Sequence, residues 1–132
     1  MEIQLVPVAS LLHIEGFSRK RVDWLTTKIR GEGRWTKPLA LDAETHLVMD
    51  GQHRMEVARR LGLEVVPAAL YRYSEVDIWS LRPNHTFTWE TVVSRGTAGD
   101  IFPYKTVKHA FPEPLPACDF LLAELGYDEA TG

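Results

Sequence analysis

The stretch from Asp50 to Arg54, with the sequence DGQHR, constrains the fold of this chain more than any other. It follows a short apolar run, Leu47–Met49, that is typical of a buried strand, and it precedes a segment whose apolar residues recur at helical spacing. The chain must therefore turn from strand to helix at Gly51, because glycine permits the sharp backbone angle of such a turn. A helix N-terminus favours anions, and His53 and Arg54 add side-chain donors there. The stretch predicts a cradle for a phosphate or a carboxylate; a tight turn with a solvated His and Arg is the alternative.

The apolar pattern of the whole chain predicts an α+β fold, a small mixed sheet with helices packed on it. Ser18 and Thr88 are expected to cap helices, and Gly31 and Gly96 to end them. Residues 76–81 fit either a strand or a short helix, and residues 100–109 lack a clear period and are expected to form a loop. The expected strands are residues 3–8, 38–42, 46–49 and 65–71, and the expected helices are residues 19–30, 52–61, 89–94 and 117–125.

Length and charge limit the classes of function. The 132 residues, 45% of them hydrophobic, suffice for one domain spanning residues 1–132, with residues 1–75 as its core and residues 76–125 as an extension. The net charge of −3 argues against a dedicated nucleic-acid protein, so no specific DNA partner is expected, although Arg19–Arg21 form a local basic patch. A single cysteine, Cys118, excludes an internal disulfide. Without a leader-like or membrane-spanning apolar run, the expectation is a cytoplasmic protein that does not bind membranes.

Two carboxylates are candidates for chemistry. Glu15 lies between apolar neighbours in a connection and could serve as a general base, although a solvent-facing loop acid is the simpler interpretation. Asp50 suits Mg²⁺, which takes one or two carboxylates together with phosphate oxygens. His53 and Glu56 lie three residues apart, but no further His or Cys completes a zinc site. Because both common glycine-rich phosphate loops are missing, a bound nucleotide would have to be held by residues 50–54.

A cationic segment near the C-terminal end is a second candidate for anion binding. Lys105, Thr106, Lys108 and His109 combine ammonium groups, a hydroxyl and an imidazole within five residues. Surface loops are often rich in lysine, so this signal alone is weak. Trp79 lies in an apolar run, where its default role is in the core.

Together these motifs resemble the ParB/sulfiredoxin superfamily. The resemblance is carried by Pro38-Leu39, by the DGQHR stretch, by Leu61-Gly62 and by Val66-Pro67. Three further features narrow it to the free L-serine kinases of that superfamily: His13-Ile14-Glu15, Trp79, and the segment from Phe102 to His109. The chain departs from the family at Gln52, where His is common, and its segment Thr106–His109 is one residue longer than the Thr-Arg-His of the family.

This resemblance implies a small-molecule kinase that transfers a phosphoryl group from ATP or ADP, with Mg²⁺, to the hydroxyl of free L-serine or a close analogue. It implies that Gly51, Gln52, His53 and Arg54 bind the nucleotide phosphates. It also implies that Asp50 holds Mg²⁺ or orients the acceptor and that Glu15 takes the hydroxyl proton. Substrate contacts would come from Trp79, Thr106, Lys108 and His109.

Other members of the superfamily fit less well. Sulfiredoxin needs a cysteine in the turn, where this chain has Gln52. A ParB-type DNA clamp needs a helix-turn-helix domain after its nucleotide domain, and no such segment is expected here. A non-catalytic nucleotide-binding regulator or binding module remains the alternative to a kinase. The sequence leaves the oligomeric state open.

Overall fold

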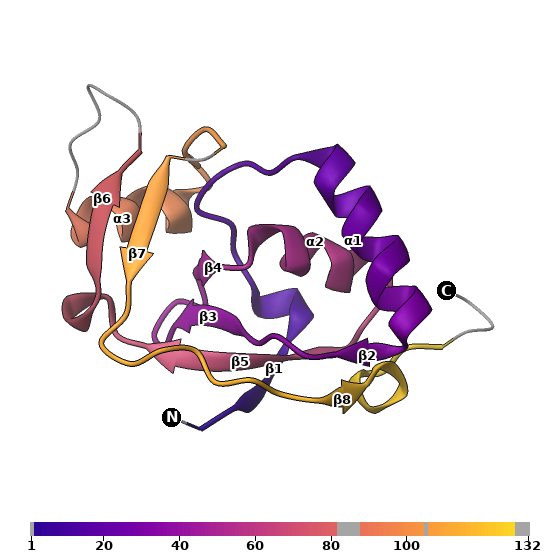
Figure 1. The fold of residues 1–132 in the computed structure, drawn as a ribbon. Helices are drawn as coiled ribbons and strands as arrows, with labels where there is room; N and C mark the ends of the chain where they lie inside the picture. Colours follow the sequence, from indigo (N-terminus) through magenta and orange to yellow (C-terminus); the bar gives the residue numbers. More distant parts are fainter. Residues whose placement is uncertain (1, 82–87, 105, 129–132) are drawn as a thin grey trace.

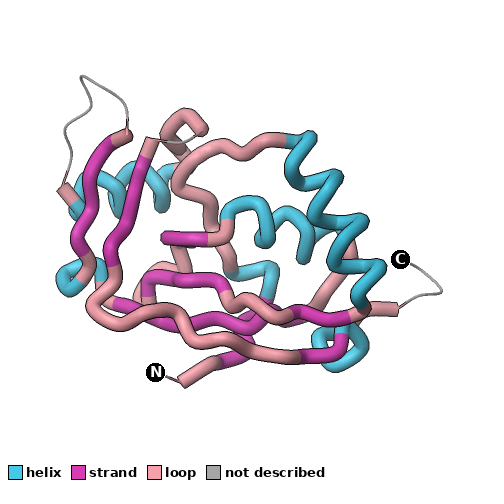
Figure 2. The backbone as a smooth tube through the Cα atoms, in the orientation of Figure 1, coloured by secondary structure: helices cyan, strands magenta, loops and turns pink. Residues whose placement is uncertain are grey.

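A computed structural model describes residues 2–81, 88–104 and 106–128 of the chain. Figure 1 shows the arrangement of its helices and strands, and Figure 2 shows the same backbone by type of structure. The α-helices are α1 (Arg19–Glu32), α2 (Gln52–Arg60) and α3 (Trp89–Ala98). The strands are β1 (Gln4–Pro7), β2 (Arg34–Trp35), β3 (Leu39–Asp42), β4 (Val48–Asp50), β5 (Val65–Tyr71), β6 (Asp77–Ser80), β7 (Val107–Ala110) and β8 (Phe120–Leu121). The short 3₁₀ helices are η1 (Val8–Ser10), η2 (Tyr73–Glu75) and η3 (Leu122–Leu125).

The main sheet is mixed, as the sequence predicted. Its strand order is β1-β5-β3-β4, with β3 and β5 parallel and the two outer pairs antiparallel. The connection from β3 to the parallel strand β5 passes through β4 and α2, because parallel neighbours need a long crossover. Two smaller antiparallel pairs, β2–β8 and β6–β7, complete the strands of the described residues. This topology puts the β4–α2 turn at one end of the sheet, beside the β6–β7 pair (Figure 1).

Two hydrophobic clusters hold these layers together. In the first, α1 and α2 pack on the main sheet through the apolar stripes predicted from helical spacing, which include Val22, Leu25 and Met55 (Figure 1). The second lies where Ile14, Leu47 and Val92 meet, and it joins the main sheet to α3 and the β6–β7 pair. The pocket described below lies between these two groups of elements.

Helix α1 begins as predicted but ends two residues later. The Ser18 hydroxyl accepts a hydrogen bond from the backbone N–H of Arg21 (3.2 Å), which is the expected N-cap. Gly31 lies within the helix, whereas Gly33 adopts a left-handed conformation (φ 71°) as the C-cap. A glycine therefore does end α1, as predicted, but it is Gly33 and not Gly31.

Helix α3 is also longer than predicted. Thr88 caps it as expected, but the helix continues through Gly96 to Ala98 and ends at Gly99 (φ 78°). A Cβ atom at Gly96 would lie 2.6 Å from Cδ2 of Leu47 and 3.4 Å from Cγ2 of Ile14. Gly96 therefore permits close packing of α3 against the segment that carries Ile14, instead of ending the helix.

The C-terminal third contains two strands that the sequence pattern did not predict. Part of the expected loop at residues 100–109 belongs to β7, which pairs with β6, so residues 76–81 contain a strand and no short helix. The helix expected at residues 117–125 is instead β8 followed by η3. Leu122 and Leu125 are buried there, whereas Leu121 is exposed. Short two-stranded pairs alternate too little for periodicity to reveal them.

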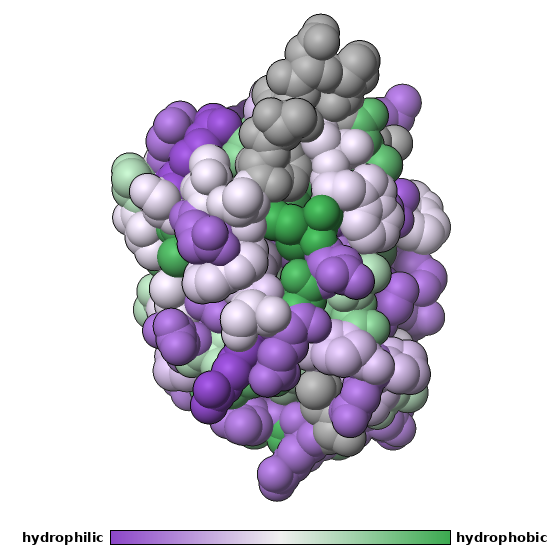
Figure 3. Space-filling model, turned by 90° about the vertical axis from the view of Figure 1, so that its left-hand side faces the viewer, coloured by the Kyte–Doolittle hydropathy of each residue, from purple (hydrophilic) through white to green (hydrophobic). Residues whose placement is uncertain are grey.

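The face of the molecule on the β6–β7 side is mainly polar. Figure 3 shows the face formed by the β6–β7 side of the molecule, with a small apolar patch among hydrophilic side chains. Trp79 on β6 is 46% exposed, so its default assignment to the core was wrong. No helix within the described ranges is long and apolar enough to cross a membrane.

Candidate functional site

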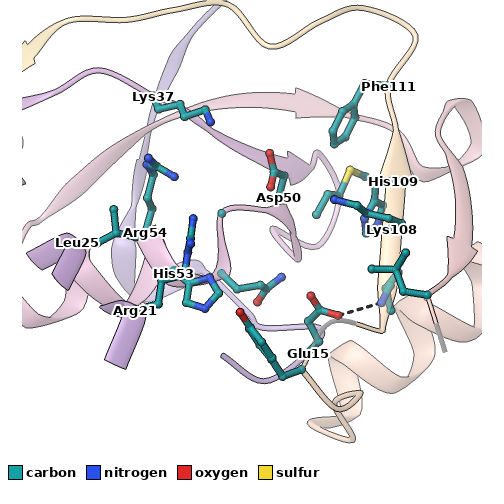
Figure 4. Close-up of a pocket in the computed structure, with 16 residues that line it drawn as sticks. Glu15, Arg21, Leu25, Lys37, Asp50, His53, Arg54, Lys108, His109 and Phe111 are labelled. Carbon is teal, nitrogen blue, oxygen red and sulfur yellow. Dashed lines mark hydrogen bonds between the residues drawn. The ribbon is translucent and has the colours of Figure 1, made fainter. Parts of the chain in front are cut away.

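A cavity of about 450 Å³ opens where the β4–α2 turn faces the start of α1 and the strand β7. Figure 4 shows its lining side chains, with Arg21, His53 and Arg54 on one side of Asp50 and Lys108, His109 and Phe111 on the other. Eight of the predicted site residues line it: Glu15, Asp50, Gly51, Gln52, His53, Arg54, Lys108 and His109. The fold thus brings together two stretches that are more than 50 residues apart in the sequence.

The β4–α2 turn depends on glycine, as predicted. Gly51 has a φ of 108°, and a Cβ atom on it would lie 2.5 Å from Cδ2 of the buried Leu39. The first helical hydrogen bond of α2 runs from Met55 N to Gly51 O (2.8 Å), so the N–H groups of residues 52–54 precede it. The helix N-terminus therefore meets the cavity with its backbone donors and the positive end of its dipole.

Three cationic side chains line the same side of the cavity. Arg54 comes from α2, Arg21 from the first turn of α1, and Lys37 from the residue before Pro38. Burial lowers the pKa of Arg54, while Asp50 raises it and Arg21 lowers it further. Arginine nevertheless stays charged, so this side of the cavity presents concentrated positive charge to an anion.

His53 is held in a defined tautomer. Its Nε2 accepts a hydrogen bond from the backbone N–H of Ser18 (3.0 Å), so in the neutral ring the hydrogen is on Nδ1. The ring also makes edge contacts with Phe17 and Tyr104, at centroid distances of 6.5 and 5.4 Å. In this state the His53 ring has a hydrogen-bond donor, the kind of group expected from the sequence, and carries no full charge.

Glu15 is anchored to the opposite wall through one oxygen. Its Oε2 accepts hydrogen bonds from the backbone N–H groups of Thr106 and Val107, each at 2.9 Å. Its backbone pairs with Phe102, with Gly16 N donating to Phe102 O at 2.9 Å. The interpretation of Glu15 as a solvent-facing loop acid therefore fails, because the carboxylate is half-buried and faces the cavity (Figure 4).

His109 is an uncharged member of the lining. Burial, together with the neighbouring charge of Lys108, lowers the pKa of His109 to about 4. Its Nε2 lies 2.9 Å from the Tyr73 hydroxyl, and burial raises the pKa of Tyr73, with Asp42 and Glu15 adding to the effect. At neutral pH His109 therefore acts through hydrogen bonding, and Lys108 is the cation on this side of the cavity.

Gln52 is buried at the floor of the cavity and connects three segments. Its amide donates to Val48 O, and its Oε1 lies 2.6 Å from Nδ1 of His13. The other ring nitrogen of His13 lies 2.6 Å from Oε1 of Glu56. The expected phosphate-contacting stretch thus contains one residue, Gln52, whose side chain points into the protein.

Two predicted substrate residues lie outside the cavity lining. Thr106 is fully buried, its hydroxyl donates to Pro103 O at 2.6 Å, and its backbone N–H donates to Glu15 of the cavity lining. Trp79 lies across from Lys108 in the β6–β7 pair and is half exposed. Lys105 lies outside the described residues.

Eight lining residues had no site role predicted from the sequence: Arg21, Leu25, Lys37, Met49, Leu81, Tyr104, Val107 and Phe111. Arg21 was noted only as part of a basic patch, although a cation in the first turn of a helix is unfavourable there and hints at an anionic partner. Lys37 precedes the strand that the sequence predicted from Pro38, which is a weak signal. Tyr104 and Phe111 carry no signal, because only the tertiary fold brings them to the cavity.

The described residues contain no cluster of three or more His, Cys, Asp or Glu that could hold a metal by itself. Asp50 is exposed at the end of β4 and lines the cavity, with Arg54 on one side and Lys108 on the other (Figure 4). One carboxylate beside a cationic surface suits Mg²⁺ that is bound together with a phosphate, because that ion is commonly held by one or two carboxylates plus phosphate oxygens.

Comparison with known proteins identifies the fold. No protein-family model matches the sequence, and no curated protein matches it. Solved structures do match. A free serine kinase in complex with AMP matches with a TM-score of 0.84 and 14% identity, over 94% of this chain and 93% of that chain. A mutant free serine kinase in complex with ADP matches with a TM-score of 0.85 and 13% identity, over 95% of this chain and 94% of that chain. SbnI with a C-terminal truncation, from Staphylococcus aureus, also matches, with a TM-score of 0.83 and 12% identity over 96% of this chain and 90% of that chain. A conserved hypothetical protein from Pyrococcus furiosus matches with a TM-score of 0.84 and 13% identity, over 95% of this chain and 97% of that chain. The chain therefore has the fold of free serine kinases, and the resemblance seen in the sequence is confirmed at that level.

Proposed function

We propose that this protein is a small-molecule kinase that transfers a phosphoryl group from ATP or ADP to the hydroxyl of free L-serine or a close analogue. One observation carries the proposal: a single cavity combines a cationic helix N-terminus with a carboxylate, Glu15, on the opposite wall. A phosphoryl-transfer site needs both an anion cradle and a group that accepts the hydroxyl proton. The shared fold with free serine kinases supports the same assignment.

In this proposal the nucleotide phosphates lie at the β4–α2 turn. The backbone N–H groups of Gly51 and Gln52, the ring of His53 and the guanidinium of Arg54 bind them, and Arg21 and Lys37 add positive charge. These groups oppose the charge that builds up on the transferred phosphoryl group. The cradle holds the donor in a fixed orientation, which contributes to the rate by positioning.

Glu15 is the proposed general base. Its Oε2 is held by two backbone N–H groups, so the rotation of the carboxylate is restricted and Oε1 is the atom that receives the proton. Because a free alcohol is a far weaker acid than a carboxylic acid, the proton moves late, as the new P–O bond forms. The hydroxyl oxygen then carries the phosphoryl group, and the nucleotide leaves with one phosphate fewer.

The acceptor occupies the side of the cavity that faces β7. Lys108 supplies the cation for an amino-acid carboxylate, and neutral His109 supplies a hydrogen bond. Thr106 contributes by fixing Glu15 through its backbone N–H. Trp79 stays assigned to the rim of the acceptor site, as the sequence resemblance implies. Asp50 would hold Mg²⁺ together with phosphate oxygens, and the ion would supply charge neutralisation between donor and acceptor.

The proposal is tested by incubating the protein with Mg²⁺, either ATP or ADP, and a panel of hydroxylated and non-hydroxylated amino acids, followed by mass spectrometry. The expected product is O-phosphoserine or the phosphate ester of a close analogue, with none from alanine. If the protein binds nucleotide but phosphorylates no acceptor with either donor, the kinase assignment is wrong. That result would favour a nucleotide-binding regulator or binding module.

A further inference from the structure

The side chains behind the cavity floor form a chain of hydrogen bonds that no step of the proposed reaction uses. It runs from Glu56 through His13 and Gln52 to the backbone of Val48. Nε2 of His13 lies 2.6 Å from Oε1 of Glu56, and Nδ1 of His13 lies 2.6 Å from Oε1 of Gln52. His13 and Glu56 are largely buried, with side chains 12% and 16% exposed. The ring of His13 also stacks on Phe17 at a centroid distance of 5.2 Å.

The partners of His13 determine its charge. The Gln52 amide nitrogen donates to Val48 O, which leaves the amide oxygen facing Nδ1 of His13; a reversed amide would set two acceptors against each other at Val48. Oε1 of Glu56 accepts both from Arg59 Nη1 (3.0 Å) and from His13 Nε2. The arginine favours the ionised carboxylate, so both neighbours of the His13 ring are acceptors. Both ring nitrogens must then carry hydrogen, which makes His13 an imidazolium.

We infer that His13 is a charged positioning residue that holds the proposed base, Glu15, in register with the phosphate cradle. His13 lies two residues before Glu15, Gln52 is the first residue of α2, and Val48 lies two residues before Asp50. The imidazolium therefore ties together the three segments that carry Glu15, the cradle and Asp50. This role in positioning rests on the proposed kinase function, whereas the charge of His13 does not.

The charge is tested directly by NMR on the full-length protein labelled with ¹⁵N-histidine. The ring nitrogens of His13, assigned by their loss in His13→Gln, are expected to be both protonated at about pH 7.5, where an unconstrained imidazole is mostly neutral. A single protonated ring nitrogen at that pH overturns the inference. The measurement needs neither nucleotide nor acceptor, so it stands whether or not the protein is a kinase.

The positioning role is tested by steady-state kinetics of His13→Gln. Misplacing a catalytic group relative to its substrate lowers the turnover number, so kcat is expected to fall roughly 10- to 100-fold. The KM for nucleotide should change by less than about threefold, because the cradle residues are retained. Glu56→Gln should act in the same direction, and the double variant should lose less than the product of the two single effects, because the residues act as a unit.

His46→Asn is the matched control. His46 bonds to Ser10 outside the cavity, and asparagine tolerates its positive φ of 62°. It should leave kcat and KM unchanged. If His13→Gln lowers thermal stability but leaves kcat per folded enzyme unchanged, His13 is merely structural and the positioning role is wrong. If the wild type turns over no acceptor, the proposed function and the positioning role fall together, while the NMR result still decides the charge.

Discussion

Arg54 is the side chain whose task follows most directly from its surroundings. Its guanidinium is half-buried at the start of α2, close enough to Arg21 to be affected by that second cation. Two like charges in a partly desolvated place oppose each other unless an anion joins them. Burial is the largest cause of the lowered pKa of Arg54; the carboxylate of Asp50 raises this pKa by more than Arg21 lowers it, but not enough to offset the burial. The arrangement is that of a site prepared for a ligand with negative charge.

Arg54→Ala should therefore weaken nucleotide binding by about 1.5–3 kcal/mol, the range for a hydrogen bond to a charged group. Isothermal titration calorimetry with ADP and ATP measures this. Arg34→Ala is the matched control, because Arg34 is exposed and pairs with Asp119 outside the cavity. Equal nucleotide affinity in both folded variants would mean that Arg54 does not bind phosphate.

At the scale of elements, the β4–α2 turn determines where the cradle lies. Its backbone needs a residue without Cβ for two reasons: the φ of 108° and the closeness of Leu39, whose side chain is fully buried and cannot easily move. By contrast, Gly31 lies within α1, and a Cβ there would meet nothing within 4 Å. Two glycines of the same chain thus have opposite roles.

Gly51→Ala should lower the free energy of unfolding by at least about 1–3 kcal/mol, from backbone strain and the clash with Leu39. Gly31→Ala, its control, should raise it by roughly 0.5–1 kcal/mol, because alanine is the better helix former. Urea denaturation of both variants checks the pair. A Gly51→Ala variant as stable as the wild type would show that the turn is not constrained as described.

Elements with strong local signals could be predicted from the sequence. The β5 strand, the Ser18 cap and the apolar stripes of α1 and α2 were predicted correctly because each is encoded by contiguous residues. The same holds for the glycine turn that leads from β4 into α2 at Gly51. The β7 and β8 strands were missed because they are short and gain their pairing from distant partners. Gly96 was wrongly predicted to end a helix. It instead permits close tertiary packing against Leu47, which no local pattern reveals.

The site was only partly predictable for the same reason. Glu15 and Lys108 were singled out by their residue type, but their shared cavity follows from the pairing of residues 14–16 with residue 102. Lys37 and Phe111 reach the cavity through that same tertiary arrangement and have no motif of their own. The inward direction of Gln52 depends on the presence of His13, 39 residues earlier.

At the scale of the whole molecule, burial of His109 links the site to stability. The ordinary pKa of histidine, about 6.5, applies to the unfolded chain, whereas the folded value is about 4. As the pH falls below 6.5, the unfolded state takes up a proton that the folded state does not bind until about pH 4. His109 therefore makes the protein less stable over this window as the pH falls, and it contributes nothing above it.

Between pH 7.5 and pH 5.5 the wild type should lose about 1.4 kcal/mol more of its free energy of unfolding than His109→Gln, since one pH unit below the unfolded pKa corresponds to that amount. Denaturant unfolding at the two pH values gives the four free energies needed. The carboxylates common to both proteins contribute equally to the two changes in free energy, so their contribution cancels when the changes are compared. Equal losses in the two proteins would show that His109 titrates normally.

The most direct test of the central claim measures nucleotide affinity and phosphoryl transfer on one preparation of Glu15→Gln. Glutamine keeps a carbonyl oxygen that can accept the hydrogen bonds from Thr106 and Val107, so the fold should survive, but its amide cannot take a proton. If Glu15 is the general base, the variant should keep wild-type nucleotide affinity and form O-phosphoserine roughly 10²–10⁴-fold more slowly, the range for loss of a general base. A Glu15→Gln variant that forms the product at the wild-type rate would contradict it.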